Sequence, residues 1–329
     1  MSKPKVLVIK TLSEEARQYL STYCEIDEAP PGIIADRDAL KARLAGASGL
    51  LQSGVAINEE LLAAAPGLKI VSNISVGYNN YDIQAMKARG VMGTNTPYVL
   101  DDTVADLIVG LMISAARRLP ELDAMVKRGE WGELGGKSDE PYFGLDVHHA
   151  TLGIIGMGRI GEAVAKRAAH GFDMKVLYSN RNRKPEAEKQ YGAEYRTMEQ
   201  LLQQSDFIII MTPLTPETHR MIGKEQFDMM KRTAILINAS RGQIIDEPAM
   251  IAALQQKRIF AAGLDVFEQE PVAADNPLLQ LPNVVTLPHI GSATARTRHD
   301  MLMAAARNLV AGITGQRPPN LVPELAEIE

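Results

Sequence analysis

Residues 151–183 read TLGIIGMGRIGEAVAKRAAHGFDMKVLYSNRNR, and this stretch decides the predicted fold. A short apolar run predicts a strand, and the glycines that follow it, Gly156, Gly158 and Gly161, form the pattern G-x-G-x-x-G. Apolar residues then recur at helical spacing from 159 to 169, and 175–178 predicts a second strand. The glycine pattern alone is weak evidence, but the order strand, glycine loop, helix, strand is typical of a dinucleotide-binding unit.

Each glycine of this loop has a separate predicted role. Gly156 permits a tight turn, Gly158 lets the backbone approach a pyrophosphate, and Gly161 lets the helix pack closely on the strand. The free N–H groups at the start of the helix, around Arg159 and Ile160, would bind the phosphates. The alternative is a glycine-rich turn in an ordinary unit of strand and helix.

The end of the second predicted strand bears on the choice between NADH and NADPH. An NAD-binding unit usually carries an acidic residue here that binds the ribose hydroxyls, but this chain has the run SNRNRK at 179–184. Arg181 and Arg183 would attract the 2′-phosphate of NADPH; one such contact is worth roughly 1.5–3 kcal/mol, or about 10-fold to 150-fold in relative affinity. We therefore expect NADPH to be preferred and NADH to bind more weakly. The alternative is a solvated basic turn.

Length and composition limit the classes of protein to which this chain can belong. A chain of 329 residues fits two domains of ordinary size, and 46% hydrophobic residues can form large cores. The net charge of -5, without an extended basic patch, argues against a nucleic acid partner. Cys24 is the single cysteine, and there is no signal peptide and no apolar run near the membrane-spanning length. We therefore expect a cytoplasmic protein without a membrane partner.

The first 100 residues alternate between predicted strands and predicted helices. Strand-like runs occur at 5–9, 49–53, 69–74 and 91–96, and helix-like segments at 13–20, 35–45, 58–65 and 81–88. This alternation is typical of a parallel sheet with helices on its faces. One loop, ISVGYNN at 74–80, could point adjacent backbone amides near Gly77 at an anion, although a plain turn is the alternative.

A long, largely apolar helix is predicted at 103–118, with Asp101 or Asp102 as its N-cap. Both of its faces are apolar, so we expect it to be buried between domains or between subunits.

Residues 129–149 are irregular in sequence and contain Trp131. We expect this segment to be an arm that packs on a partner. The adjacent His148 and His149 have no further ligand at metal-binding spacing, so we expect no metal site.

Four more strands are predicted beyond the dinucleotide unit, at 207–211, 234–237, 261–264 and 284–287. The residues that follow these strands include Thr212, Pro213, Ala239, Ser240, Arg241, Asp265, Glu270, His289 and Gly291. In an open parallel sheet, ligands bind outside the carboxyl ends of the strands. We therefore expect Arg241, Glu270 and His289 to lie on the same edge as the glycine loop and to converge on the nicotinamide.

These three side chains suit the reduction of a 2-oxo acid. Hydride transfer to a ketone creates an alkoxide that needs a proton, and His289 is the candidate donor. A carboxylate on the far ring nitrogen, the role given to Glu270, would favour the imidazolium and fix the ring. Arg241 offers a planar fork for the substrate carboxylate and can polarise the neighbouring carbonyl. The alternatives are a surface histidine, an exposed glutamate and an arginine paired with a nearby aspartate.

With these residues identified, the chain resembles the D-isomer-specific 2-hydroxyacid dehydrogenases over nearly its whole length. Within this family it is most similar to the bacterial glyoxylate/hydroxypyruvate reductases that also reduce 2-ketogluconate. The resemblance is carried by SVGYNNYD (75–82), DDTVAD (101–106), DVHHATLGIIGMGRIG (146–161), NASRGQIIDE (238–247), AAGLDVFEQEP (261–271) and PHIGSAT (288–294). Formate dehydrogenases of the same fold have Gln where this chain has Glu270. The replacement of the common acidic residue by Asn180 and Arg181 looks like the NADPH-preferring branch.

The resemblance implies an α/β fold with two domains, in which a doubly wound Rossmann sheet is inserted in a flavodoxin-like substrate domain. Residues 101–293 would bind the dinucleotide, and residues 1–100 with 294–329 would bind the substrate. The family also implies a homodimer joined through the cofactor domain.

The resemblance also implies a set of site residues. Arg241, Glu270 and His289 would be catalytic, and the substrate would be held by backbone amides at Val76 and Gly77 together with Arg241 and His289. The residues expected to contact the cofactor are Thr103, Gly156, Gly158, Arg159, Ile160, Gly161, Ser179, Asn180, Arg181, Arg183, Thr212, Pro213, Ala239, Ser240, Asp265 and Gly291.

The leading hypothesis is therefore an NADPH-dependent reductase of glyoxylate and hydroxypyruvate, with 2-ketogluconate as a further candidate substrate. Two alternatives stay open: a dinucleotide-sensing interaction protein similar to the transcriptional corepressors of this fold, and a phosphite-oxidising relative. Some relatives insert a tryptophan into the neighbouring subunit's active site, but GELGGKSDE (132–140) does not match them, so this role is not transferred to Trp131.

Overall fold

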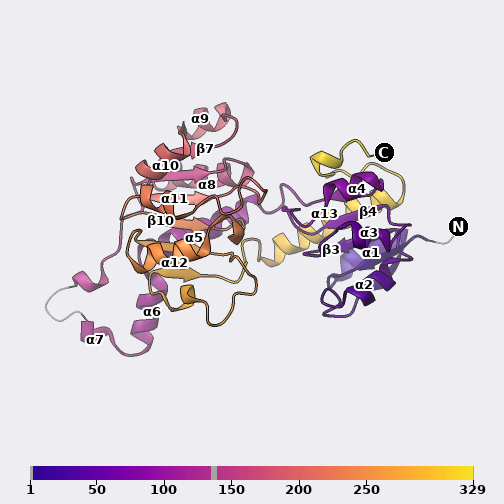
Figure 1. The fold of residues 1–329 in the computed structure, drawn as a ribbon, viewed down its shortest axis with the longest axis horizontal. Coiled ribbons are helices and arrows are strands. Elements are labelled where there is room, and N and C mark those ends of the chain that lie inside the picture. Colours follow the sequence, from indigo (N-terminus) through magenta and orange to yellow (C-terminus); the bar gives the residue numbers. More distant parts are fainter. Residues whose placement is uncertain (1–2, 135–138, 329) are drawn as a thin grey trace. The chain divides into compact units, whose positions relative to one another are not determined.

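The computed structural model describes residues 3–134 and 139–328, which form two compact units (Figure 1). One unit contains residues up to Leu100 and from Ala293 onward, and the other contains Asp101–Ser292. Each is built on one parallel sheet with helices packed against it, as predicted. In the described ranges, no helix is long and apolar enough to cross a membrane.

The sheet of the first unit has the strand order β2-β1-β3-β4-β5. Its strands are β1 (Lys5–Val8), β2 (Glu25–Glu28), β3 (Gly49–Gln52), β4 (Ile70–Asn73) and β5 (Met92–Thr94). This order is that of the flavodoxin-like fold, so the prediction is confirmed. Strand β2 escaped prediction because its sequence EIDE is polar, which suits an edge strand with little burial.

Helices cover both faces of this sheet. They are α1 (Glu14–Tyr23), α2 (Arg37–Leu44), α3 (Glu59–Ala63), α4 (Ile83–Ala88), α13 (Ala295–Ile313) and the 3-10 turn η4 (Pro323–Leu325). Helix α13 packs on β3, β4 and α1, while α2, α3, α4 and η4 contribute to a separate buried cluster that includes Leu40, Leu61 and Met86. Helix α13 buries Leu302, Leu309 and Ile313. Burying an aliphatic side chain stabilises by roughly 1.5–3 kcal/mol, so α13 is a principal element of the packing on its own face of the sheet.

The sheet of the second unit has the strand order β12-β11-β10-β9-β6-β7-β8. Its strands are β6 (Thr151–Ile155), β7 (Lys175–Ser179), β8 (Glu194–Tyr195), β9 (Phe207–Ile210), β10 (Ile235–Asn238), β11 (Ala261–Leu264) and β12 (Val284–Thr286). The order reverses at β6, which is the topological switch point of a Rossmann sheet. The predicted doubly wound fold is therefore confirmed.

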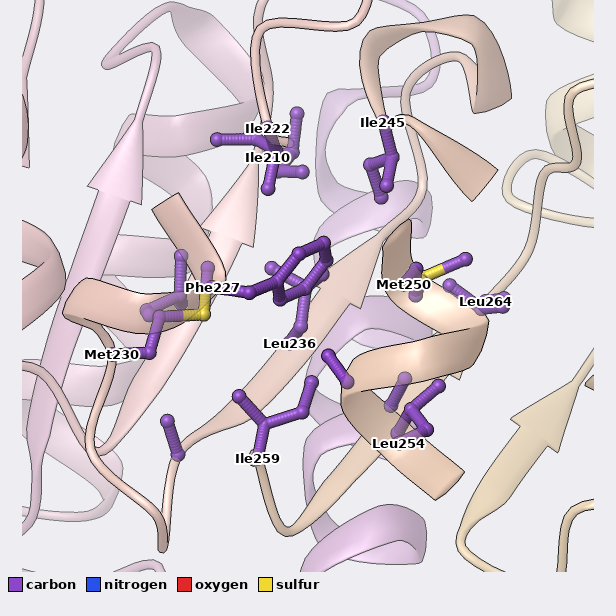
Figure 2. Close-up of a cluster of buried hydrophobic side chains, with 14 of the residues drawn as sticks. Ile210, Ile222, Phe227, Met230, Leu236, Ile245, Met250, Leu254, Ile259 and Leu264 are labelled. Carbon is purple, nitrogen blue, oxygen red and sulfur yellow. The ribbon is translucent and has the colours of Figure 1, made fainter. Parts of the chain in front are cut away.

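Helices also flank this sheet on both sides. They are α5 (Asp101–Ala116), α6 (Leu119–Lys127), α7 (Trp131–Leu134), α8 (Arg159–Gly171), α9 (Pro185–Tyr191), α10 (Met198–Gln204), α11 (Lys224–Met229) and α12 (Glu247–Gln255), with 3-10 turns η1 (Glu140–Tyr142), η2 (Gly242–Ile244) and η3 (Pro277–Gln280). Helices α5 and α8 pack against each other, whereas α10, α11 and α12 enclose the main core cluster. Figure 2 shows Phe227 pointing into this cluster toward Leu236 and Met250.

The first part of the second unit differs from the prediction in two respects. Helix α5 begins at Asp101, so Asp101 and Asp102 lie in its first turn rather than at its N-cap, where their charge still complements the helix dipole. The predicted arm at 129–149 is preceded by the unpredicted helix α6, and its residues 135–138 lie outside the described part of the chain.

Candidate active site

The glycine loop follows β6 at the switch point. Gly156 has φ 101°, and a Cβ there would lie 2.7 Å from the carbonyl carbon of Met211. A Cβ on Gly161 would lie 2.6 Å from the Gly156 oxygen. Both positions therefore require glycine, because any side chain would collide with backbone.

The start of α8 offers hydrogen-bond donors to a ligand. Gly158 is its N-cap and supplies no side-chain cap, and the space where a Cβ of Gly158 would stand has no atom within 4 Å. The first N–H groups of a helix lack intrahelical acceptors, and the positive end of the dipole adds to their attraction for anions. This open helix start suits a pyrophosphate.

A second feature beside the loop fits a dinucleotide. A Cβ on Gly156 would lie 2.8 Å from the backbone nitrogen of Thr212, so the segment after β9 runs directly against the glycine turn. The Thr212 hydroxyl is buried and has no hydrogen-bond partner among the described residues. A buried polar group normally has a partner, so this hydroxyl is positioned to bond a group that the described residues do not supply.

The two arginines of the basic loop after β7 differ in their contacts. Arg183 donates to Glu188 through Nε at 3.0 Å and Nη2 at 2.7 Å, and the Tyr178 hydroxyl donates to the same carboxylate at 2.5 Å. The hydrogen bond that Arg183 donates to Glu188 raises the pKa of the Arg183 guanidinium. Arg181 is exposed and forms no ion pair with any residue that the structure describes. Arg181 is therefore the more available cation for a phosphate.

Arg241 lies on a tightly constrained turn after β10. The buried Asn238 side chain shapes this turn, because its Nδ2 donates to the Arg241 oxygen at 2.9 Å and its Oδ1 accepts from the Ser240 amide at 3.0 Å. A Cβ on Gly242 would lie 1.9 Å from the carbonyl carbon of Phe267. Only glycine therefore lets the Arg241 turn lie against the loop that leads to Glu270.

Glu270 and His289 form a hydrogen-bonded pair. The distance between Glu270 Oε2 and His289 Nδ1 is 2.7 Å, and Glu270 Oε1 accepts from the Phe267 amide at 3.1 Å. His289 itself has φ 53°, a left-handed conformation that is uncommon outside glycine and often marks functional sites. The histidine side chain is 48% exposed, so it is accessible to a substrate.

Asp265 holds the turn that carries His289. Its carboxylate is buried and accepts from the amides of Ile290 at 2.7 Å and Gly291 at 2.8 Å. These two bonds fix the backbone directly after the histidine. Asp265 was predicted as a cofactor contact, and this anchoring role in the turn was not predicted.

The electrostatics of the cluster follow from burial and from these contacts. Burial alone would raise the pKa of Glu270, but the hydrogen bond and charge of His289, the Phe267 amide and the charge of Arg241 together lower it. Burial lowers the pKa of Arg241, and the Glu270 carboxylate opposes that effect. Burial raises the pKa of Asp265 against the pull of its two backbone donors.

The structure thus brings Arg241, Glu270, His289 and Asp265 together at the carboxyl ends of adjacent strands in the second unit. Thr103 lies in the first turn of α5. Ser179 is the last residue of β7, and the remaining predicted cofactor residues of the second unit lie in loops that follow β6, β7, β9, β10 and β12 or at the start of α8.

Val76 and Gly77 lie in the loop after β4, in the first unit. Both are partly exposed.

The adjacent His148 and His149 contact each other edge to face, with ring centroids 5.0 Å apart. Among the described residues, no group of three or more metal-ligating side chains occurs.

Comparison with known proteins adds independent information. The family model for the D-isomer specific 2-hydroxyacid dehydrogenase, NAD binding domain, matches residues 109–291. The chain is 47% identical over 320 residues to glyoxylate/hydroxypyruvate reductase B of Yersinia pestis strain Pestoides F, covering 97% of each protein. It is 48% identical over 321 residues to the reductase of the same name from Erwinia tasmaniensis, covering 97% of this chain and 99% of the relative.

Solved structures agree with this similarity. An NADPH-dependent glyoxylate/hydroxypyruvate reductase from Sinorhizobium meliloti, solved with NADP and malonate, matches with a TM-score of 0.88 and 32% identity over 100% of this chain and 99% of its own. The TT0316 protein of Thermus thermophilus matches with a TM-score of 0.86 and 40% identity, over 97% and 99% of the two chains.

Proposed function

Because this chain belongs to the D-isomer-specific 2-hydroxyacid dehydrogenase family, we propose that it is an NADPH-dependent reductase of small 2-oxo acids. Glyoxylate and hydroxypyruvate are the proposed substrates, and 2-ketogluconate is a further one. The observation that carries the proposal is the His289–Glu270 pair, 2.7 Å apart, on the strand-end edge that also bears Arg241. The names of the relatives support the same substrate class.

His289 is the proposed proton donor. NADPH, when bound, supplies the hydride, and the carbonyl oxygen of the substrate must gain one proton to become a hydroxyl. The Nδ1 atom of His289 bonds Glu270, which leaves Nε2 as the atom that delivers the proton. The ionised Glu270 favours the protonated imidazole and fixes the plane of the ring.

Arg241 is the proposed carboxylate-binding and carbonyl-polarising group. Its guanidinium stays charged despite burial, because arginine does not deprotonate in proteins. A planar fork can bond a carboxylate and also lie beside the carbonyl next to it. The backbone amides of Val76 and Gly77 are the proposed second set of donors to the same carboxylate.

The fit of the second unit to a dinucleotide supports the proposed cofactor. The open start of α8 and the glycine turn would hold the pyrophosphate, and the unpartnered Thr212 hydroxyl would bond the cofactor as well. Arg181 would bind the 2′-phosphate, with Arg183 beside it. The NADPH dependence of the Sinorhizobium meliloti relative supports this choice.

We also infer a cytoplasmic homodimer joined through the cofactor domain. Four large apolar side chains of the segment that follows α5 are exposed, namely Leu119 (48%), Val126 (50%), Trp131 (68%) and Phe143 (58%). Apolar side chains gathered on one segment are typical of an interface. Light scattering should give twice the chain mass, and Leu119→Asp with Val126→Asp should give the mass of one chain.

One panel tests the proposed reaction. Glyoxylate, hydroxypyruvate and 2-ketogluconate are offered with NADPH and with NADH, and phosphite is offered with NADP. We expect turnover of the two smaller oxo acids with NADPH. Arg241→Ala should raise the KM and lower kcat together, because one group both binds the carboxylate and polarises the carbonyl. Turnover of phosphite alone, or binding of NADPH without turnover of any oxo acid, would contradict the proposal.

A further inference from the structure

The loop after β4 is held through its carbonyl groups. Three consecutive carbonyl oxygens each accept a hydrogen bond: Ser75 from the Thr96 amide at 2.9 Å, Val76 from Asn95 Nδ2 at 2.8 Å, and Gly77 from Asn73 Nδ2 at 2.8 Å. All three donors come from the framework of the first unit, at or directly after β4 and β5. The peptide planes between Ser75 and Tyr78 are therefore fixed by neighbouring strands.

Fixing these carbonyls also fixes the N–H groups. In a trans peptide the N–H and C=O bonds point in opposite directions, and the structure records a cis bond only at Glu270–Pro271 within its described ranges. The amides of Val76, Gly77 and Tyr78 have no acceptor among the described residues. All three residues are partly exposed, so their donors are available to a ligand.

The donors that hold the loop are themselves rigidly held. Asn73 is 1% exposed, and its Oδ1 accepts from Nε2 of the fully buried Gln52 at 2.9 Å. The backbone carbonyl oxygen of Asn95 accepts from Nδ2 of Asn308 at 3.1 Å. Asn308 is fully buried on α13, and its Oδ1 accepts from the Asn320 side chain at 3.1 Å. The side-chain amides of Asn73 and Asn308 are buried and have partners at both the oxygen and the nitrogen. Such amides resist reorientation, because a lost partner would leave a desolvated polar group.

We propose that Asn95 and Asn73 are positioning residues for substrate recognition, which orient the backbone amides at Val76, Gly77 and Tyr78 to receive the carboxylate of the 2-oxo acid. This inference rests on the proposed function. Neither side chain touches the substrate in this scheme; each acts by anchoring a carbonyl. Donors that are already oriented bind a carboxylate without the ordering cost of a free loop.

The experiment compares two substrates that differ only in the carboxylate. Hydroxypyruvate carries it, and hydroxyacetone has a methyl group in its place. Asn95→Ala and Asn73→Ala should lower the ratio of kcat/KM for hydroxypyruvate to that for hydroxyacetone by about 10-fold or more, mainly through KM. The KM for NADPH should change by less than about 2-fold.

Asn320→Ala is the matched control. It removes the side-chain bond to Asn308, but the backbone amide of Asn320 still donates to Asn308 Oδ1 at 3.2 Å. The carbonyls of Val76 and Gly77 keep their donors, so the substrate ratio should stay at the wild-type value. Asn95→Leu has a side chain of nearly the same size but without a hydrogen-bond donor. It replaces the alanine variant in the experiment if that variant unfolds. Malonate carries a carboxylate but no carbonyl to reduce, so its inhibition constant reports carboxylate binding alone. This constant should rise in the variants whose ratio of kcat/KM falls.

Three results would overturn the inference: an equal loss of activity on both substrates, an unchanged ratio in the Asn95 and Asn73 variants, or the same loss in Asn320→Ala. Failure of the proposed function looks different, because the wild-type enzyme would then turn over neither glyoxylate nor hydroxypyruvate with NADPH. In that case malonate binding to the wild-type and variant proteins decides the inference by itself.

Discussion

Replacing Arg181 with alanine should reduce the preference for NADPH over NADH. Because Arg181 is exposed, the contact it would make with a 2′-phosphate belongs at the lower end of the range for charge-assisted bonds, about 1.5 kcal/mol. That free energy corresponds to about a 10-fold rise in the KM for NADPH. The KM for NADH should be nearly unchanged, because NADH lacks the phosphate.

Arg183→Ala should have a smaller effect. The Arg183 guanidinium already bonds Glu188 through two nitrogens, so a phosphate would have to replace that carboxylate rather than add a new contact. We expect a change of less than about 5-fold in the KM for NADPH. Glu188→Gln weakens the competing pair and should lower the KM for NADPH.

Steady-state kinetics with both cofactors at saturating hydroxypyruvate measure these effects. Arg196→Ala is the control, because it removes a positive charge that pairs with Glu194 at the edge strand β8 of the same unit. It should leave both KM values unchanged. The reasoning is refuted if the wild-type enzyme prefers NADH, or if Arg181→Ala raises both KM values in equal proportion.

Four further outcomes are expected. His289→Gln should lower kcat about 100-fold or more with NADPH affinity retained, as measured by single-turnover kinetics and fluorescence titration; turnover like that of the wild type would remove the proton-donor role. Glu270 has a lowered pKa, so its ionised form supports the pair at pH above the ordinary glutamate value, and that support is lost as the pH falls through the lowered pKa. Glu270→Gln should therefore remove the fall in kcat/KM that the wild-type enzyme shows at acid pH, and a variant that keeps the wild-type acid limb would show that the carboxylate does not act on the imidazole. Gly242→Ala should lower the free energy of unfolding, measured by urea titration, by about 1–3 kcal/mol and abolish most activity, because its Cβ would meet the Phe267 carbonyl. Gly46→Ala is the control: it has open space around it and should change neither the free energy of unfolding nor the activity. Burial raises the pKa of the Cys24 thiol to about 11, so a thiol reagent at pH 8 should label it only in urea, and rapid labelling of the folded protein would contradict the buried position.

The features that sequence reasoning predicted depend on local constraints or on topology. Gly156 and Gly161 could be identified because turn geometry and close packing exclude side chains at these positions. The meeting of Glu270 with His289 followed from parallel strands, whose carboxyl ends share one edge. Neither inference needs knowledge of side-chain rotamers.

The features that it missed depend on contacts between distant residues. Asn308 bonds the Asn95 carbonyl across 213 positions of sequence, and no periodicity marks such a pair. The ion pair between Arg183 and Glu188 depends on the rotamers of both side chains, which the sequence does not specify. The edge strands β2 and β8 are short and polar, so they lack the apolar alternation from which strands are predicted.

The place of α13 in the chain has a consequence for synthesis on the ribosome. Strands β3 and β4 pack against α13, yet roughly 200 residues separate β5 from that helix. At a translation rate of about 5–20 residues per second, α13 is synthesised about 10–40 seconds after β5. During that interval the intervening unit is translated whole, so it can fold first while the apolar strands of the first sheet stay without the helix that covers them.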